Sequence, residues 1–201
     1  DEFQIGKGTK NCKINLEQID TEELAEERRV QSAYAVIQQL DGMFGAKALK
    51  ELARELVAVS PQVKATEAFS VFNAKTFLFA IDDGCGLTTA LKYLGKLIQG
   101  LELFEFTEGY QEIEVVVENN EKDPWAQITA VDKFKRKMIS FDISSFVNHT
   151  EDPRFRKMLG RLAEIQKDYI FVFRIPGIEG IALEKMYQAI YDVMCVRLIP
   201  F

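Results

Sequence analysis

The residues that suggest chemistry lie in one stretch, 77–91, where an apolar segment runs into a glycine-bearing turn and then into an amphipathic segment. This order is typical of a buried β-strand followed by a loop and a helix. The backbone N–H groups of such a loop, together with the positive end of the helix dipole, bind anions. The stretch therefore predicts an anion site where the strand passes into the helix.

The turn differs in its charge from the phosphate-binding pattern G-x-x-x-x-G-K-[ST]. Gly86 and Thr88 occupy their motif positions, but Ile81 replaces the first glycine and Leu87 replaces the lysine. That lysine brings positive charge to the β- and γ-phosphates of a nucleotide. Carboxylates in the turn would instead repel a triphosphate. We interpret the turn as a degenerate nucleotide loop made of Asp82, Asp83, Gly84, Cys85, Gly86, Leu87 and Thr88.

One cation is expected to face this loop. The apolar segment 169–173 ends at Arg174, and ligands of parallel sheets bind at the carboxyl ends of the strands. We predict that Arg174 forms an ion pair with Asp82 or Asp83; the alternative is that all three side chains are solvated. The end of this segment carries no acid, so neither a metal ligand nor a catalytic residue is expected there.

The elements that must position these residues alternate between helices and strands. Two helices are expected at 20–40 and 46–59, the second ending before Pro61 because the residue before a proline avoids helical backbone. From residue 76 the order is strand, helix, hairpin, strand, helix, strand, helix, strand, with the last strand at 195–199. This order indicates an α/β fold with right-handed crossovers and a mainly parallel sheet.

Residues 101–125 are strongly acidic and form the expected hairpin. The alternation of apolar and acidic residues predicts two antiparallel strands at 101–106 and 112–118. Carboxylates on an edge strand discourage edge-to-edge pairing, and we prefer this role to the alternative of an acidic docking surface. The basic run 133–137 is interpreted as a solvated face or as a partner of the hairpin, rather than as a nucleic-acid patch.

The composition argues against several functions. The chain has 201 residues, of which 47% are hydrophobic, and a formal net charge of −6. This charge disfavours binding to nucleic acid or to acidic membranes, and no apolar run is long enough to span a bilayer. Unpaired cysteines at 12, 85 and 195 indicate reduced thiols of a cytoplasmic protein. His149, the single histidine, has no partners for a catalytic triad.

Residues 40–57 resemble the helical segment that precedes the nucleotide site in bacterial AAA+ ATPases, closest to the sporulation-associated and Rubisco-activase-like branch. Residues 79–90 are similar to the P-loop of that family, its Walker A motif, and residues 139–146 to its second core strand. Residues 170–174 fall where the strand with the magnesium-holding and catalytic acids ends. The resemblance covers residues 40–201, with 101–135 as an insertion.

The resemblance implies a P-loop NTPase-like three-layer sandwich with an N-terminal helical extension and the antiparallel acidic hairpin as an insertion. We expect a lead-in and helical hairpin over 1–60, and an α/β core over 61–201 that lacks the helical lid. The expected function is that of a catalytically inactive domain, without metal or cofactor, that binds a protein partner or itself as an interaction or scaffolding module. The alternative is an ATPase with a variant site that binds ATP and Mg²⁺ weakly.

Overall fold

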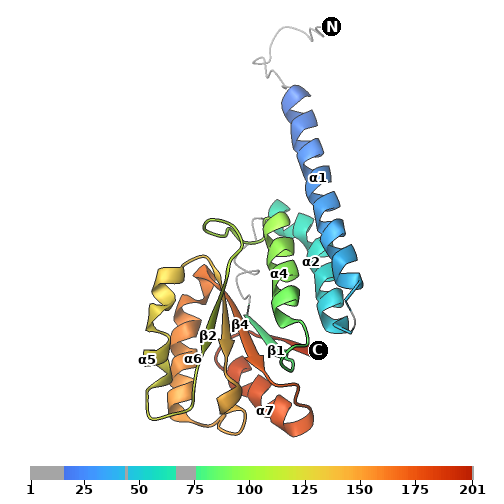
Figure 1. Cartoon of the computed structure of the whole chain (residues 1–201). Helices are drawn as coiled ribbons and strands as arrows, with labels where there is room; N and C mark the ends of the chain where they lie inside the picture. The colour runs from blue at the N-terminus through green and yellow to red at the C-terminus, as the bar shows by residue number, and fades with distance from the viewer. Residues whose placement is uncertain (1–15, 44, 67–75, 201) are drawn as a thin grey trace.

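The structure, a computed structural model, describes residues 16–43, 45–66 and 76–200 (Figure 1). Its helices are α1 (Leu16–Asp41), α2 (Lys47–Ala65), α4 (Leu87–Gly100), α5 (Pro124–Gln127), α6 (Pro153–Ile165) and α7 (Gly180–Tyr191), with short 3₁₀ helices at Thr129–Phe134, Ser144–Phe146 and Gln166–Asp168. Its strands are β1 (Thr76–Ala80), β2 (Glu112–Val116), β3 (Met138–Asp142), β4 (Ile170–Ile175) and β5 (Arg197–Pro200).

The strands form one sheet in the order β2-β3-β4-β1-β5, and every neighbouring pair is parallel. The central strands β1, β3 and β4 are almost entirely buried, because helices cover both of their faces. This arrangement confirms the predicted α/β class with a parallel sheet. Its register places Arg174 of β4 between Phe79 of β1 and Asp142 of β3.

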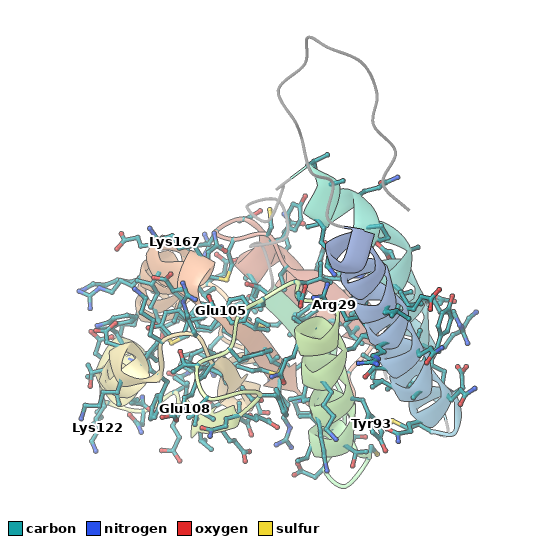
Figure 2. The ribbon with its side chains drawn as sticks, turned by 90° about the horizontal axis from the view of Figure 1, so that it is seen from above. Arg29, Tyr93, Glu105, Glu108, Lys122 and Lys167 are labelled. Atoms are coloured by element: carbon teal, nitrogen blue, oxygen red, sulfur yellow. The ribbon has the colours of Figure 1, made fainter. Side chains whose placement is uncertain are left out.

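Two apolar clusters separate the helices into layers. Apolar side chains of α1, α2 and α4 pack on one face of the sheet together with Phe77 and Phe79. Apolar side chains of α6 and α7 pack on the other face with Leu78 and Ala80. Alternate residues of β1 therefore belong to different cores, as expected for a two-residue side-chain period. Figure 2 shows the two helical layers on either side of the strands.

The predicted antiparallel hairpin is wrong. Residues 101–111 form no strand, and β2 pairs in parallel with β3. Leu101, Leu103 and Phe106 are buried in the cluster that contains α4, so their alternation with polar residues reflects a packed connection. The backbone leaves the extended region at Glu102 and Glu108, where φ is 55° and 61°.

The acidic connection instead meets the basic run at the amino ends of the strands. Arg136 forms an ion pair with Glu105, and Lys137 Nζ lies 3.7 Å from Glu108 Oε2. A third acid, Glu102, pairs with Arg29 of α1 at 3.0 Å. Glu105, Glu108 and Arg29 are labelled in Figure 2. These contacts support the interpretation of the basic run as a partner of the acidic segment.

The second helix does not end before its proline. α2 continues to Ala65 with Pro61 inside it, so the predicted end at residue 59 is wrong. Pro61 has no N–H to donate to the carbonyl oxygen of Val57. The hydroxyl of Ser60 donates to that oxygen instead, at 3.0 Å, which satisfies the orphaned acceptor. Two further boundaries differ from the sequence prediction. α1 begins at Leu16 rather than at residue 20, and the last strand starts at Arg197 rather than at residue 195.

No helix in the described part of the chain is both long and apolar enough to cross a membrane.

Candidate functional site

The degenerate loop lies at the carboxyl edge of the sheet, between β1 and α4. Its neighbour there is the loop after β4, because β1 and β4 are adjacent and parallel. The chain leaves β1 toward α4 on one face of the sheet, and leaves β4 toward α7 on the other. Ligands of α/β proteins bind where neighbouring connections diverge in this way.

The backbone of the loop keeps features of an anion site. Gly84 and Gly86 have φ values of 80° and 91°, a region that glycine enters without steric penalty. Gly86 is the N-cap of α4 and provides no side-chain cap for the first amides of the helix. The N–H of Cys85, in contrast, donates within the loop to the carbonyl oxygen of Asp82 at 3.2 Å.

Arg174 occupies the centre of this edge. Its Nη2 forms an ion pair with Asp83, which confirms the predicted pairing of Arg174 with a loop carboxylate. Its Nη1 lies 3.6 Å from Asp142 Oδ2 and 3.8 Å from Glu114 Oε1. The Arg174 side chain is only 17% exposed. One guanidinium thus lies among three carboxylates, each from a different element.

Asp82 has a different partner. Its Oδ1 accepts a hydrogen bond of 2.8 Å from the N–H of Gly177, in the loop that follows β4. A Cβ on Gly177 would lie 3.1 Å from Asp82 Oδ2, so a larger residue there would require the Asp82 carboxylate to shift by a few tenths of an ångström. Asp82 therefore holds the two loops together, while Asp83 engages the arginine.

The loop and Arg174 enclose a pocket of about 240 Å³. Its lining is Asp82, Asp83, Gly84, Gly86, Leu87, Thr88, Thr89 and Arg174. The structure thus brings the predicted site residues together, except Cys85, which is exposed and lies outside this lining. Leu87 also packs against the apolar cluster of α4, where a phosphate-binding loop has a lysine.

Asp142 is the residue of this edge that the sequence interpretation missed. The end of β4 carries no acid, as expected, but β3 beside it ends in a carboxylate. The sequence does contain a signal that could have identified Asp142: the mainly apolar run 138–141, typical of a buried strand, ends directly in this aspartate. In P-loop NTPases an aspartate and a loop Ser or Thr hold Mg²⁺.

Here Asp142 is already engaged within the protein. Besides the contact with Arg174, its Oδ1 accepts hydrogen bonds from the N–H and the hydroxyl of Ser144, at 3.0 and 2.5 Å. The described residues contain no group of three or more His, Cys, Asp or Glu side chains placed to hold a metal ion.

No family model matches the chain, and no curated protein sequence does. Among solved structures, the chain is similar to C. elegans PCH-2, with a TM-score of 0.41 and 13% sequence identity. The similarity covers 80% of this chain and 44% of that chain, so this chain spans less than half of that protein. A similarity of this size assigns no family. The class that the fold and site define is an α/β protein with a strand–loop–helix unit at the carboxyl edge of a parallel sheet.

Proposed function

We propose that the chain is an AAA+-like domain that does not hydrolyse nucleotide and acts as a protein-interaction or scaffolding module. The observation that carries the proposal is the ion pair between Arg174 and Asp83, which places the protein's own charges where a nucleotide's phosphates would bind. The sequence resemblance of residues 40–57 and 79–90 supports a relationship to the sporulation-associated and Rubisco-activase-like branch of the bacterial AAA+ ATPases.

Electrostatics argue against strong nucleotide binding. A triphosphate would have to displace Asp83 from Arg174 and then lie beside the remaining carboxylates, without the lysine that Leu87 replaces. Loss or inversion of one close charge contact weakens binding by about 2–5 kcal/mol, which is roughly 30-fold to several-thousand-fold in affinity.

An interaction role is supported by the surface that the helical layer presents. α1 extends well beyond the sheet (Figure 1). Two of its large apolar side chains, Leu24 and Tyr34, are more than half exposed. The proposed partner is another protein or a second copy of the chain. A reducing, cytoplasmic location is proposed as well, because Cys85 and Cys195 are free and exposed.

Calorimetric titration with ATP and ADP in the presence of Mg²⁺ tests the proposal. We expect no measurable heat of binding and no change in the thermal midpoint at millimolar nucleotide. Micromolar affinity would overturn the proposal. In a gain-of-function variant, Leu87→Lys combined with Asp83→Asn restores the motif lysine and removes the competing carboxylate. This variant is expected to bind ATP, whereas the matched control Leu87→Met is not.

The alternative is an ATPase with a variant site. It is favoured by the uncapped start of α4, by Thr88 in the pocket lining, and by Asp142 at the end of β3, next to Arg174 of β4. If this alternative holds, ATP binding depends on Mg²⁺ in the native chain, and Asp142→Asn removes that dependence. The same titrations therefore separate the two functions.

A further inference from the structure

The strand β2 forms one edge of the sheet, with β3 as its neighbour on one side. The N–H of Val117, directly after β2, donates to the carbonyl oxygen of Asp142 at 2.9 Å. Because the ladder bonds of a parallel pair recur at every second residue, the even-numbered residues of β2 turn their N–H and C=O groups away from β3. These residues are Glu112, Glu114 and Val116. Within the part of the chain that the structure describes, no hydrogen bond reaches these outward groups.

The second half of this edge is open to solvent. Val116 is 57% exposed, and the side chain of Glu114 is 65% exposed. A row of outward N–H and C=O groups on an exposed edge is a template for a further strand. The geometry therefore allows another extended segment to pair with β2.

One face of this edge carries negative charge that the protein does not balance. Glu112 and Glu114 lie on the same face, because side chains alternate along a strand. Glu114 Oε1 lies 3.8 Å from Arg174 Nη1, but that guanidinium also serves Asp83 and Asp142. Burial, and then the charge of Glu114, raises the pKa of Glu112 above its ordinary value. A cation placed beside these two carboxylates would be attracted.

The other face of β2 is apolar. Ile113 and Val115 are half-buried there, and Val115 packs against the cluster that contains α6. A strand added to this edge would place alternate side chains beside the carboxylates and beside these apolar residues. Its best sequence therefore alternates basic and apolar residues.

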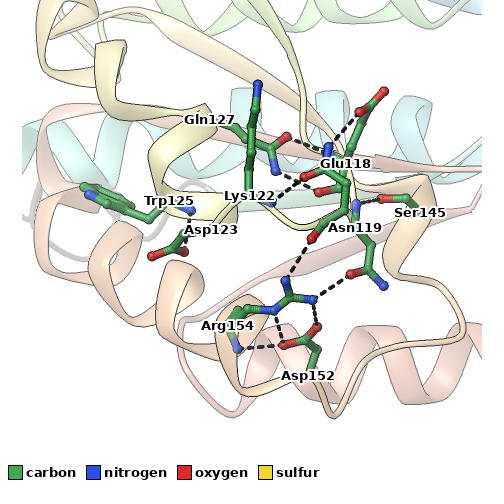
Figure 3. A network of polar contacts seen from close by, with 10 residues as sticks. Glu118, Asn119, Lys122, Asp123, Trp125, Gln127, Ser145, Asp152 and Arg154 are labelled. Atoms are coloured by element: carbon green, nitrogen blue, oxygen red, sulfur yellow. Dashed lines mark hydrogen bonds and ion pairs between the residues drawn. The ribbon is translucent and has the colours of Figure 1, made fainter.

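A network of polar contacts fixes the segment that follows β2 (Figure 3). The N–H of Asn119 donates to Ser145 Oγ at 2.8 Å, and Arg154 Nη2 donates to Asn119 Oδ1 at 3.0 Å. The side chain of Gln127 accepts from the N–H of Glu118 and donates to its carbonyl oxygen, at 2.9 and 2.8 Å. The carboxyl end of β2 is thus held in place before anything binds, which reduces the entropy lost on binding.

A second copy of the chain is a poor occupant of this edge. Antiparallel pairing centred on Glu114 would place the two Glu114 side chains directly opposite each other, and like charges in that position are destabilising. The formal net charge of −6 adds to the repulsion between copies. A basic segment of another protein meets neither obstacle.

We infer that the free edge of β2 binds an extended segment of a partner protein in which basic and apolar residues alternate. The backbone of the segment pairs with the outward groups of Glu114 and Val116 and adds a strand to the sheet. Its basic side chains lie beside Glu112 and Glu114, and its apolar side chains lie beside Ile113 and Val115. The inference rests on the proposed interaction role, but it involves none of the residues that line the pocket of the degenerate loop.

Calorimetric titration of the whole chain with a blocked peptide of alternating lysine and valine tests the inference. Two further peptides separate its parts: one has glutamate in place of lysine, and the other is N-methylated at its backbone nitrogens. We expect each to bind at least about tenfold more weakly, through loss of the charge pairs or of the backbone hydrogen bonds. The inference is overturned if the three peptides bind equally, or if none binds at millimolar concentration.

On the protein side, Glu114→Lys is expected to weaken binding of the lysine–valine peptide about tenfold, because an attraction across the strands becomes a repulsion. Glu184→Lys is the matched control, since it makes the same change of charge at an exposed residue of α7. Equal affinities of the two variants would contradict the inference. Self-association of the native chain that competes with the peptide would identify a second copy as the occupant and would overturn it as well.

Hydrogen exchange followed by NMR locates the bound peptide. The amides of Glu114 and Val116 point outward and are expected to exchange more slowly when the peptide is bound. The amide of Val115 already belongs to the ladder with β3 and is expected to change little. Protection confined to other parts of the chain would place the peptide elsewhere and refute the assignment.

The peptide result and the nucleotide result can be separated. If the peptide does not bind, the ATP titration still decides whether the degenerate loop holds nucleotide. If ATP binds with micromolar affinity and the peptide binds as expected, the proposed inactivity fails and the site on β2 stands.

Discussion

At the scale of single residues, close packing constrains the chain as strongly as charge does. Gly95 of α4 lies directly under the ring of Tyr110, and a Cβ at that position would be 2.1 Å from two ring atoms. The hydroxyl of Tyr110 is buried without a partner among the described residues, and burial raises the pKa of Tyr110. The glycine is therefore required by the tyrosine rather than by backbone conformation.

Gly95→Ala is expected to lower the free energy of unfolding by about 1–3 kcal/mol, because the added methyl group forces the ring to move. Urea denaturation measures the change. Gly160→Ala in α6 is the matched control, since nothing lies within 4 Å of a Cβ there. That control is expected to be neutral or to stabilise by up to about 1 kcal/mol through helix propensity. Equal effects at the two positions would contradict the packing argument.

At the scale of elements, α2 shows how a side chain can carry a helix through a proline. The hydroxyl of Ser60 satisfies the carbonyl of Val57 that Pro61 leaves without a donor. Propensity alone predicts the end of the helix at this point. The interior of the helix contributes Leu49, Leu52 and Leu56 to the core, and this tertiary packing favours one continuous helix.

We predict that Pro61→Ala raises the free energy of unfolding by about 1–2 kcal/mol, because it restores the helical hydrogen bond. Ser60→Ala is expected to destabilise the native chain by about 1 kcal/mol, since it leaves a carbonyl unsatisfied. In the Pro61→Ala background the same change should cost less, because the new N–H replaces the hydroxyl. A double-mutant cycle measures this coupling, and additive effects would refute the role of Ser60.

At the scale of the whole molecule, the last strand is tied to the N-terminal helical layer. Both oxygens of Glu55 in α2 accept from Arg197 of β5, at 2.9 and 2.5 Å. The hydrogen bonds from Arg197 lower the pKa of Glu55 below its ordinary value of 4.5. The charged form of Glu55 is thus favoured in the folded state. Its contribution to stability is complete above that ordinary value and is lost as the pH falls through the lowered one.

Arg197→Met is expected to remove this acid-sensitive part of the stability. The native chain should lose more free energy of unfolding than the variant when the pH falls below 4.5. The difference should be less than about 1 kcal/mol, because both side chains are partly exposed. Urea denaturation at neutral and acidic pH measures it, with Lys96→Met as a control for loss of an exposed charge. Parallel pH profiles of the native chain and Arg197→Met would contradict the assignment.

Local patterns predicted much of the fold. The apolar runs of β1, β3 and β4 and the apolar stripes of α4 and α6 have unambiguous lengths and periods. Residues 101–111 were misassigned because a connection that buries Leu101, Leu103 and Phe106 between acidic residues resembles the apolar and acidic alternation of an edge strand. The parallel pairing of β2 with β3 depends on a crossover through α5, which no short pattern encodes.

The sequence by itself determined which charges are available at the loop: Leu87 in place of a lysine, and Asp82 and Asp83 beside it. Only the tertiary structure decided how those charges are used. Asp82 accepts a hydrogen bond from Gly177, Asp83 pairs with Arg174, and Asp142 lies beside the same arginine because β3 is the neighbour of β4 in the sheet. The reason is that charge is a property of each residue, whereas the order of parallel strands arises from crossovers between distant segments of the chain.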